Sequence, residues 1–307
     1  MDLTLVAQQT VNALTIGAIY ALIALGYTMV YGIIELINFA HGDVFMMGSF
    51  VAYSLIIRLG FSGPVGNPIE LVGVLLLVFV VTMLIMGVVG VVIERFAYRP
   101  LRHAPRLAPL ITAIGVSFIL QNIAQILFGS APVVVPQLIN IESSFDIGGV
   151  IIKYTSVFIV VITLALMVAL QAFVTRTNLG RAMRSTSQDR EAAQLMGVDI
   201  NTTIALTFFI GSALAGAAGV VQGLYFGTTV FIVGFQAGLK AFTAAVLGGI
   251  GNTTGAALGG FVIGFIEVFS TQAGYSNWSE AIVFSILILV LVFRPTGILG
   301  QQLADRA

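Results

Sequence analysis

The chain has little charge and no cysteine. Only 8% of its 307 residues are charged, against about 25% in a typical soluble domain. By contrast, 58% are hydrophobic and the mean hydropathy is +1.06, which predicts an integral membrane protein. Without cysteine, a disulfide framework and a cysteine-ligated metal site are excluded. A net charge of zero leaves no electrostatic footprint for nucleic acid, so we expect no nucleic-acid partner.

Several functional motifs are also missing. Neither Lys153 nor Lys240 stands in a G-x-x-x-x-G-K-[ST] pattern, so the sequence has no phosphate-cradling loop of its own. No H-E-x-x-H motif occurs, and neither histidine has a metal partner at helical spacing, so no metal site is predicted. The sequence also shows no pair of carboxylates and no nucleophile with a base that would form a catalytic site. We therefore predict no catalytic residues and no cofactor, and expect that the protein is not an enzyme.

Long uncharged runs fill most of the chain. A helix needs about 20 mostly apolar residues to cross roughly 30 Å of hydrocarbon. The runs are 11–34, 44–57, 71–93, 107–128, 154–175, 200–239, 241–266 and 281–293. They predict an all-α integral membrane protein with about eight transmembrane helices, in a single transmembrane domain over residues 1–307. No Lys or Arg precedes Arg58, so the first run lacks the basic region of a cleaved signal peptide and we expect it to be retained.

Basic residues collect in two stretches, and this sets the orientation. The stretches "ERFAYRPLRHAPR" (94–106) and "RTNLGRAMRSTSQDRE" (176–191) hold eight of the thirteen Lys and Arg residues. Cytoplasmic loops carry the excess of Lys and Arg, so both stretches are expected to face the cytoplasm. Arg294, which follows the last run, places the C-terminal end there as well. The sequence leaves open on which side the N-terminus lies.

Polar residues stand between two apolar runs in "INFAHGDVFMMGS" (37–49), which contains Asn38, His41 and Asp43. Backbone at membrane depth can leave the helical ladder only where protein or a water-filled cavity satisfies its polar groups. We therefore expect a broken or re-entrant helix that lines a path, and a second one near "LGGIGNTTG" in 247–260, because paired interruptions of two halves point to a pathway. A loop at the membrane surface fits the first stretch equally well.

Further polar residues lie within or beside the predicted spans. Gln121, Asn122 and Gln125 share one helix, where they either line a polar conduit or form hydrogen bonds between helices. Glu267 follows an apolar run. An ionisable group inside a span is a functional candidate, although an interfacial position is as compatible with its polar neighbours. Lys240 is expected to pair with Glu267 if their segments are adjacent.

Small residues recur every four positions in the second half. They are Gly211, Ala215, Gly219, Gly223 and Gly227, and then Gly251, Gly255 and Gly259. Such stripes let helix backbones approach closely in a membrane, so they predict buried helices. The run 154–175 has no glycine and is rich in Val, Ile and Leu, which favours a lipid-facing helix.

The basic segment 176–200 predicts a short cytoplasmic helix. Ser185 or Ser187 caps a helix over 188–196, and Gly197 ends it. Three apolar residues share one face by their spacing, namely Ala192, Leu195 and Met196. This helix either lies on lipid headgroups or enters a groove on a partner protein. Charges of both signs on its polar face argue against a simple anchor to anionic lipid.

Five stretches in the same order resemble a known family. They are "YALIALGYTMVYGIIELINFAHGD", "IERFAYRPLR", "GRAMRSTSQDREAAQLMGVD", "KAFTAAVLGGIGNTTGAALGG" and "RPTGILG". Together they look like the membrane permease of ABC importers for branched-chain amino acids, and in particular like the shorter of its two permease subunits. The resemblance covers nearly all of residues 10–300.

The resemblance implies partners. It implies pairing with a second, homologous permease subunit, two cytoplasmic ATPase subunits that bind the ATP, and a periplasmic or extracellular solute-binding protein. It also implies a multi-pass location in the bacterial inner (plasma) membrane. Segment 176–200 resembles the loop that contacts the ATPase, and the expected coupling residues are Gly180, Arg181, Ala182, Arg184, Asp189, Glu191, Ala192 and Gly197.

The function expected from these observations is an ATP-driven importer subunit for branched-chain or other neutral amino acids. The residues expected along its translocation path are Asn38, His41, Asp43, Gln121, Gln125 and Glu267. The alternative is a self-contained secondary transporter or channel for small polar solutes such as urea or amides. The sequence does not settle which solute is carried, because urea and short-amide importers use similar permeases.

Overall fold

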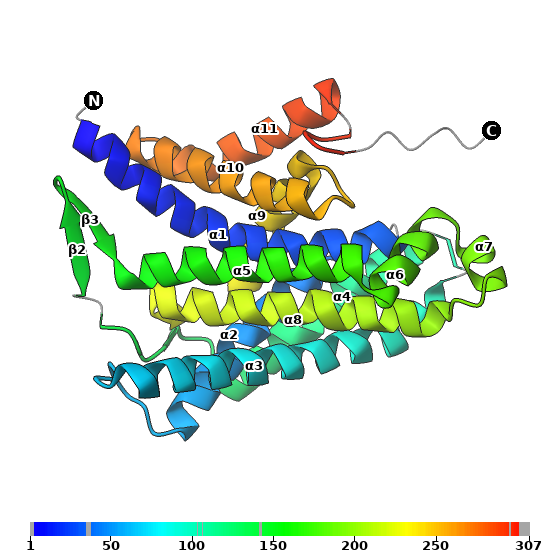
Figure 1. Cartoon of the computed structure of the whole chain (residues 1–307), viewed down its shortest axis with the longest axis horizontal. Coiled ribbons are helices and arrows are strands. Elements are labelled where there is room, and N and C mark those ends of the chain that lie inside the picture. The colour runs from blue at the N-terminus through cyan, green and yellow to red at the C-terminus, as the bar shows by residue number, and fades with distance from the viewer. Residues whose placement is uncertain are drawn as a thin grey trace.

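A computed structural model describes residues 3–34, 38–102, 104–105, 107–140, 143–294 and 296–300. Most of its long helices run roughly along the long axis of one bundle (Figure 1). Within the described residues, seven helices are long and apolar enough to cross a membrane, and Val233–Gly248 is a shorter apolar helix. The prediction of an all-α integral membrane protein with about eight transmembrane helices is therefore confirmed.

The elements follow one another along the chain as helices with two small pairs of strands. The helices are α1 (Leu3–Ile34), α2 (His41–Arg58), α3 (Pro68–Ile93), α4 (Leu107–Phe128), α5 (Tyr154–Arg176), α6 (Asn178–Gln188), α7 (Arg190–Leu195), α8 (Ile200–Phe226), α9 (Val233–Gly248), α10 (Thr253–Gln272) and α11 (Ser279–Phe293). Strand β1 (Val133–Val134) pairs antiparallel with β4 (Thr228–Thr229), and β2 (Ser144–Ile147) pairs antiparallel with β3 (Val150–Lys153). A π-helical turn (Glu94–Tyr98) and a 3-10 turn (Arg99–Leu101) prolong α3, and a 3-10 turn (Ser276–Trp278) precedes α11.

Glycine, rather than charge, divides the long uncharged run 200–239. Gly227 has a φ of +66° and ends α8 in the left-handed conformation that glycine adopts without a steric penalty. The next helix, α9, begins at Val233 and continues through Lys240, so the charged residue lies inside a helix. Hydropathy alone does not predict this boundary, because the run is uncharged on both sides of Gly227.

The core forms around α1, which packs against α5, α8, α9 and α10. Small residues allow these close contacts, as the glycine stripes predict. A Cβ added at Gly219 of α8 would lie 2.5 Å from the carbonyl oxygen of Phe45 in α2. One added at Gly17 of α1 would lie 2.8 Å from the Cα of Phe261 in α10. In contrast, α5 exposes large aliphatic side chains along its length, as expected of a lipid-facing helix.

The two ends of the bundle differ. Helices α6 and α7 project at one end and the β2–β3 hairpin at the other, where α1 begins (Figure 1). The side chain of Gln8 joins α1 to the hairpin through hydrogen bonds of 2.8 and 3.0 Å to the backbone of Ile151. At the opposite end, Arg102 donates a 2.7 Å hydrogen bond to Asn201. The two basic stretches thus lie at one end, which is expected to face the cytoplasm, and α1 begins at the opposite end.

Candidate functional site

The start of α2 and the residues just before it lie inside the bundle. Asn38 is 3% exposed, and His41 and Asp43 are fully buried. A Cβ added at Gly26 of α1 would lie 2.6 Å from Cε1 of His41. Gly26 stands eight residues before Ile34, the last residue of α1, which corresponds to about 12 Å along the helix. The prediction of a broken helix is therefore confirmed here, and the alternative of a surface loop is wrong.

Protein groups satisfy the polar atoms of Asn38 but not the ring nitrogens of His41. The side-chain oxygen of Asn38 accepts a 2.9 Å hydrogen bond from the Tyr98 hydroxyl, and its carbonyl oxygen accepts one of 3.0 Å from the His41 N–H. The His41 ring lies 4.6 Å from the ring of Tyr27, centroid to centroid. The backbone of Ile23 approaches this imidazole, but neither ring nitrogen makes a hydrogen bond of normal geometry within the described residues.

Asp43 is held by neutral donors from α4. The Ser117 hydroxyl donates to one carboxyl oxygen at 2.5 Å, and the Gln121 amide donates to the other at 3.0 Å. On its other side, α9 approaches so closely that a Cβ added at Gly234 would lie 2.9 Å from Oδ1. Among the residues that the structure describes, no basic side chain pairs with Asp43. An acidic group without a counterion at membrane depth is costly, which makes it a functional candidate.

The structure brings four of the six expected path residues together around the start of α2. They are Asn38, His41, Asp43 and Gln121. Gln125 is exposed and donates a 2.9 Å hydrogen bond to Ser130 just beyond α4. Asn122 bonds to the carbonyl of Phe118 in its own helix. The hydrogen bonds found for these two residues therefore stay on or next to α4, and Glu267 belongs to another cluster.

The predicted break in 247–260 is present as the turn 249–252, but its surroundings differ from those of the break before α2. The Asn252 side chain caps α10 by accepting a 3.0 Å hydrogen bond from the Gly255 N–H. Gly251 is exposed, and its Cα would lie 3.4 Å from a Cβ added at Gly32, near the end of α1. This turn thus lies near the end of α1, whereas the start of α2 lies deeper, because His41 is beside Gly26.

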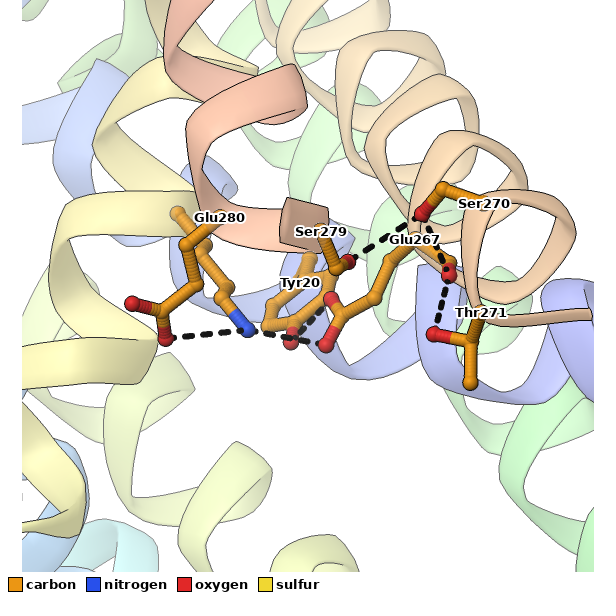
Figure 2. Close-up of polar contacts among 7 residues, drawn as sticks. Tyr20, Glu267, Ser270, Thr271, Ser279 and Glu280 are labelled. Carbon is orange, nitrogen blue, oxygen red and sulfur yellow. Dashed lines mark hydrogen bonds and ion pairs between the residues drawn. The ribbon is translucent and has the colours of Figure 1, made fainter. Parts of the chain in front are cut away.

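Glu267 forms an ion pair with Lys240, as expected if their segments are adjacent. Lys240 Nζ lies 2.8 Å from one Glu267 oxygen, and the Tyr20 hydroxyl donates to the other at 2.7 Å. Figure 2 shows Tyr20, Glu267 and Glu280 of this cluster. Glu280 lies farther from the ammonium, at 3.8 Å. The contacts join α1, α9, α10 and α11. Glu267 thus links α10 to α9 through the ion pair and to α1 through the hydrogen bond.

Removing the Lys240 charge alone is expected to destabilise the protein. In Lys240→Met, Glu267 keeps its charge without its counterion. The expected loss is roughly 2–3 kcal/mol, less than for a fully buried pair because the Glu267 side chain is 20% exposed. The double variant Lys240→Met with Glu267→Gln is expected to recover most of the melting temperature in detergent. Equal melting temperatures for the single and double variants would exclude this electrostatic effect.

The cytoplasmic segment contains two helices, so the prediction of a single helix over 188–196 capped by Ser185 or Ser187 is wrong. Asp189 separates α6 from α7 in an extended conformation. Its carboxylate accepts hydrogen bonds of 2.9 and 3.0 Å from the backbone N–H groups two and three positions on. This is the strong capping arrangement, which the serine pattern does not reveal. Gly197, with a φ of +87°, follows the second helix as predicted.

A second aspartate caps the next helix. Asp199 accepts hydrogen bonds from the Thr202 hydroxyl at 2.6 Å and from the Asn201 N–H at 2.9 Å, at the start of α8. The Thr202 hydroxyl is the main cause of a lowered pKa for this carboxyl group. Asp199 is thus ionised at neutral pH. The stability that the ionised Asp199 cap contributes is lost only as the pH falls through the lowered pKa of this carboxyl group.

The expected coupling residues of α6 are held against the end of α5. Gly180 is buried there, where a Cβ would meet the Phe173 carbonyl oxygen at 2.6 Å. The Arg184 guanidinium donates to the carbonyl of Val174 in α5, and Arg181 donates to Asn178 within α6. Ala182 is half-buried between them. These contacts orient α6 relative to the bundle and leave both arginines exposed.

The end of the segment is open to solvent. Its exposed coupling residues are Asp189, Glu191, Ala192 and Gly197. Leu195 and Met196 are 88% and 86% exposed. Two adjacent large apolar side chains that are almost fully exposed to solvent favour an interaction surface.

Two cavities lie at opposite ends of the bundle. One of about 510 Å³ separates the cytoplasmic segment from the ends of α1, α3 and α8, with Arg190 in its lining. Arg190 donates a 2.9 Å hydrogen bond to the Ile33 carbonyl. Sequence reasoning missed Arg190, because a bond to a distant backbone carbonyl leaves no pattern. The outer cavity, of about 660 Å³, is lined in part by Asn12 and Lys153.

Comparisons with known proteins agree on one family. The family model described as the permease component of the branched-chain amino acid transport system matches residues 9–292. The chain is 46% identical to the high-affinity branched-chain amino acid transport system permease protein BraD of Pseudomonas aeruginosa, over 97% of each chain. It is 44% identical to LivH of Escherichia coli, over 97% of each chain, and 26% identical to a probable LivH of Methanocaldococcus jannaschii, over 94% of this chain and 91% of the relative. No solved structure matches.

Proposed function

The chain belongs to the family of branched-chain amino acid transport system permease components, and on this premise we propose that it is the transmembrane subunit of an ATP-driven importer for branched-chain or other neutral amino acids. Proteins of this family are transport permeases, not enzymes. A self-contained transporter or channel is not favoured, because the family description makes the permease one component of a system. The proposed subunit has no cofactor of its own, and partner subunits bind the ATP.

The proposed translocation path passes the start of α2. Asn38, His41, Asp43 and Gln121 surround a break that lies deep in the bundle. Cavities of about 510 and 660 Å³ lie at the two ends of the bundle, and the first is lined by Tyr98, the hydrogen-bond donor to Asn38. Gln125 on the exposed face of α4 is proposed to contribute to the path where a second permease completes it. The ion pair of Glu267 favours anchoring over a place in this path.

The proposed partners are a second homologous permease, two cytoplasmic ATPase subunits and an extracytoplasmic solute-binding protein. The protein is proposed to form one permease domain in the plasma membrane, which in a bacterium is the inner membrane, with segment 176–200 as its coupling loop. The observation that carries the ATPase contact is the exposure of Leu195 and Met196, at 88% and 86%, on a segment that projects from the end of the bundle (Figure 1). Such side chains suit an apolar groove on a partner.

The coupling surface predicts a docking defect. Arg181→Ala and Glu191→Ala each remove an exposed charge from the segment. Each variant is expected to reach the membrane in normal amount and to retain about a tenth of the co-purifying ATPase, since one interfacial charged hydrogen bond contributes about a factor of ten. Arg95→Ala, also exposed at the cytoplasmic end, is the control and is expected to bind normally.

Affinity purification from native membranes tests the assembly directly. The expected companions are one further permease and two ATPase subunits, identified by mass spectrometry, with the solute-binding protein captured when substrate is present. A protein that purifies alone from mild detergent, and whose Arg181 and Glu191 variants support normal uptake, would argue against the proposal.

A further inference from the structure

Arg190 reaches from the cytoplasmic segment to the last turn of α1. Its guanidinium donates a 2.9 Å hydrogen bond to the Ile33 carbonyl in a partly buried position. Carbonyls in the last turn of a helix lack an intrahelical partner, and the helix dipole favours a cation there. A hydrogen bond from a charged donor is roughly twice as strong as one between neutral groups. This contact is therefore a firm point of attachment between two elements that are far apart in the sequence.

The surroundings of this bond are hollow. The cavity of about 510 Å³ is lined on one side by Ile33 and Ile34 of α1 and on the other by residues 186–191. An empty gap transmits little force through van der Waals packing, because its lining atoms have no partners across it. Helix α6 packs against α1 directly, but α7 faces α1 across this cavity. A displacement of α7 would thus act on the end of α1 through the Arg190 guanidinium.

The end of α1 is next to the proposed path. Residues 35–37 lie outside the described part of the chain, and Asn38 follows with its hydrogen bond of 2.9 Å from Tyr98. His41, the first residue of α2, packs against Gly26 and Tyr27 of the same α1 helix. A shift of α1 relative to α3 and α4 would therefore move the start of α2, and with it the Asp43 carboxylate.

We propose that Arg190 is a positioning residue that couples ATPase-driven movement of the cytoplasmic segment to the end of α1 and so to the start of α2. This inference rests on the proposed function, because it assumes a partner ATPase that moves the segment. Arg190 acts through the Ile33 carbonyl and does not itself contact the transported solute. It is distinct from Arg181 and Arg184, which bond within α6 and to α5.

The test measures ATP hydrolysis and uptake together. The complete assembly, with both permeases, the ATPases and the solute-binding protein, is reconstituted in liposomes with labelled leucine. Arg190→Ala is expected to assemble fully and hydrolyse ATP at close to the normal rate, while uptake falls about tenfold, the factor expected for one charged hydrogen bond. The ATP used per leucine imported then rises by the same factor. Arg190→Lys keeps the charge but not the planar guanidinium group. Its ratio of ATP to leucine is expected to lie between those of the unaltered assembly and of Arg190→Ala.

Arg95→Ala is the matched control, since this exposed arginine lies at the same end of the bundle but outside segment 176–200, and it should leave the ratio of ATP to leucine unchanged. The inference is overturned if hydrolysis and uptake fall in proportion in both Arg190 variants, or if neither changes. It is also overturned if the variants lose the ATPase from the complex, because Arg190 would then be a docking residue. Failure of the unaltered assembly to import any amino acid would instead refute the proposed function.

Discussion

Replacing Gly42 with leucine is expected to prevent the protein from folding stably. A Cβ at this position would lie 2.9 Å from the Cα of Gly238 and would also meet the carbonyl oxygen of Gly234. Both are backbone atoms of α9, so no side chain can turn aside. Helices α2 and α9 would have to separate where the Asp43 carboxylate packs. The expected cost is about 3 kcal/mol or more, at or beyond the upper end for overpacked cores.

The measurement is the yield of monodisperse protein in detergent and its melting temperature. Gly73→Leu is the matched control, because Gly73 is an exposed glycine of α3 with nothing within 4 Å of an added Cβ. The control is expected to behave as the unaltered protein, whereas Gly42→Leu should be recovered mainly as aggregate. Equal yields and melting temperatures for the two variants would show that the close contact of α2 with α9 is not required.

Replacing Asp43 with asparagine is expected to reduce uptake strongly while the protein still folds. Asparagine has nearly the same shape, and the Ser117 hydroxyl can turn from donor to acceptor to match the new amide group. What disappears is the negative charge at membrane depth. If this charge attracts the ammonium group of an amino acid in the path, its loss should lower uptake by about 10- to 100-fold, the range for one charged hydrogen bond.

Uptake of labelled leucine by the reconstituted assembly measures this effect, with the melting temperature as the check on folding. Ser117→Ala removes one donor to Asp43 but keeps its charge, and we expect it to lower uptake much less than Asp43→Asn. Normal uptake by Asp43→Asn would show that the carboxylate serves only to hold α4 against α2.

Much of the fold is predictable from the sequence, because a membrane span depends on a local property. Uncharged runs predict the helices, and the basic stretches predict a shared end of the bundle, which is confirmed by the cavity that Arg102 and residues 186–191 line together. Asn, Gly and Asp between apolar runs predict an interruption of the helix at 38–43, but the sequence leaves open whether it is buried or lies in a surface loop. Only the structure shows that these residues are buried. The sequence predicts the ion pair of Lys240 with Glu267 only if their segments are adjacent, and the structure shows that they are.

The remaining features depend on contacts that no local pattern records. The Arg190 side chain bonds to the backbone carbonyl of Ile33, which any residue at that position would offer. Asp189 caps α7 in preference to the nearby serines, because the chain turns extended at that residue. The grouping of Gln121 with Asp43, without Gln125, depends on how α4 is rotated against α2. Rotation and packing between helices follow from the whole bundle.

Reconstitution with and without the ATPase subunits tests the central claim most directly. The purified chain, its second permease and the solute-binding protein are placed in liposomes, and accumulation of labelled leucine is measured with ATP inside. We expect accumulation against the gradient only when the ATPases are included and ATP is hydrolysed, because the chain contains no phosphate-binding loop. Accumulation without the ATPases, driven by an ion gradient and indifferent to ATP, would contradict the claim.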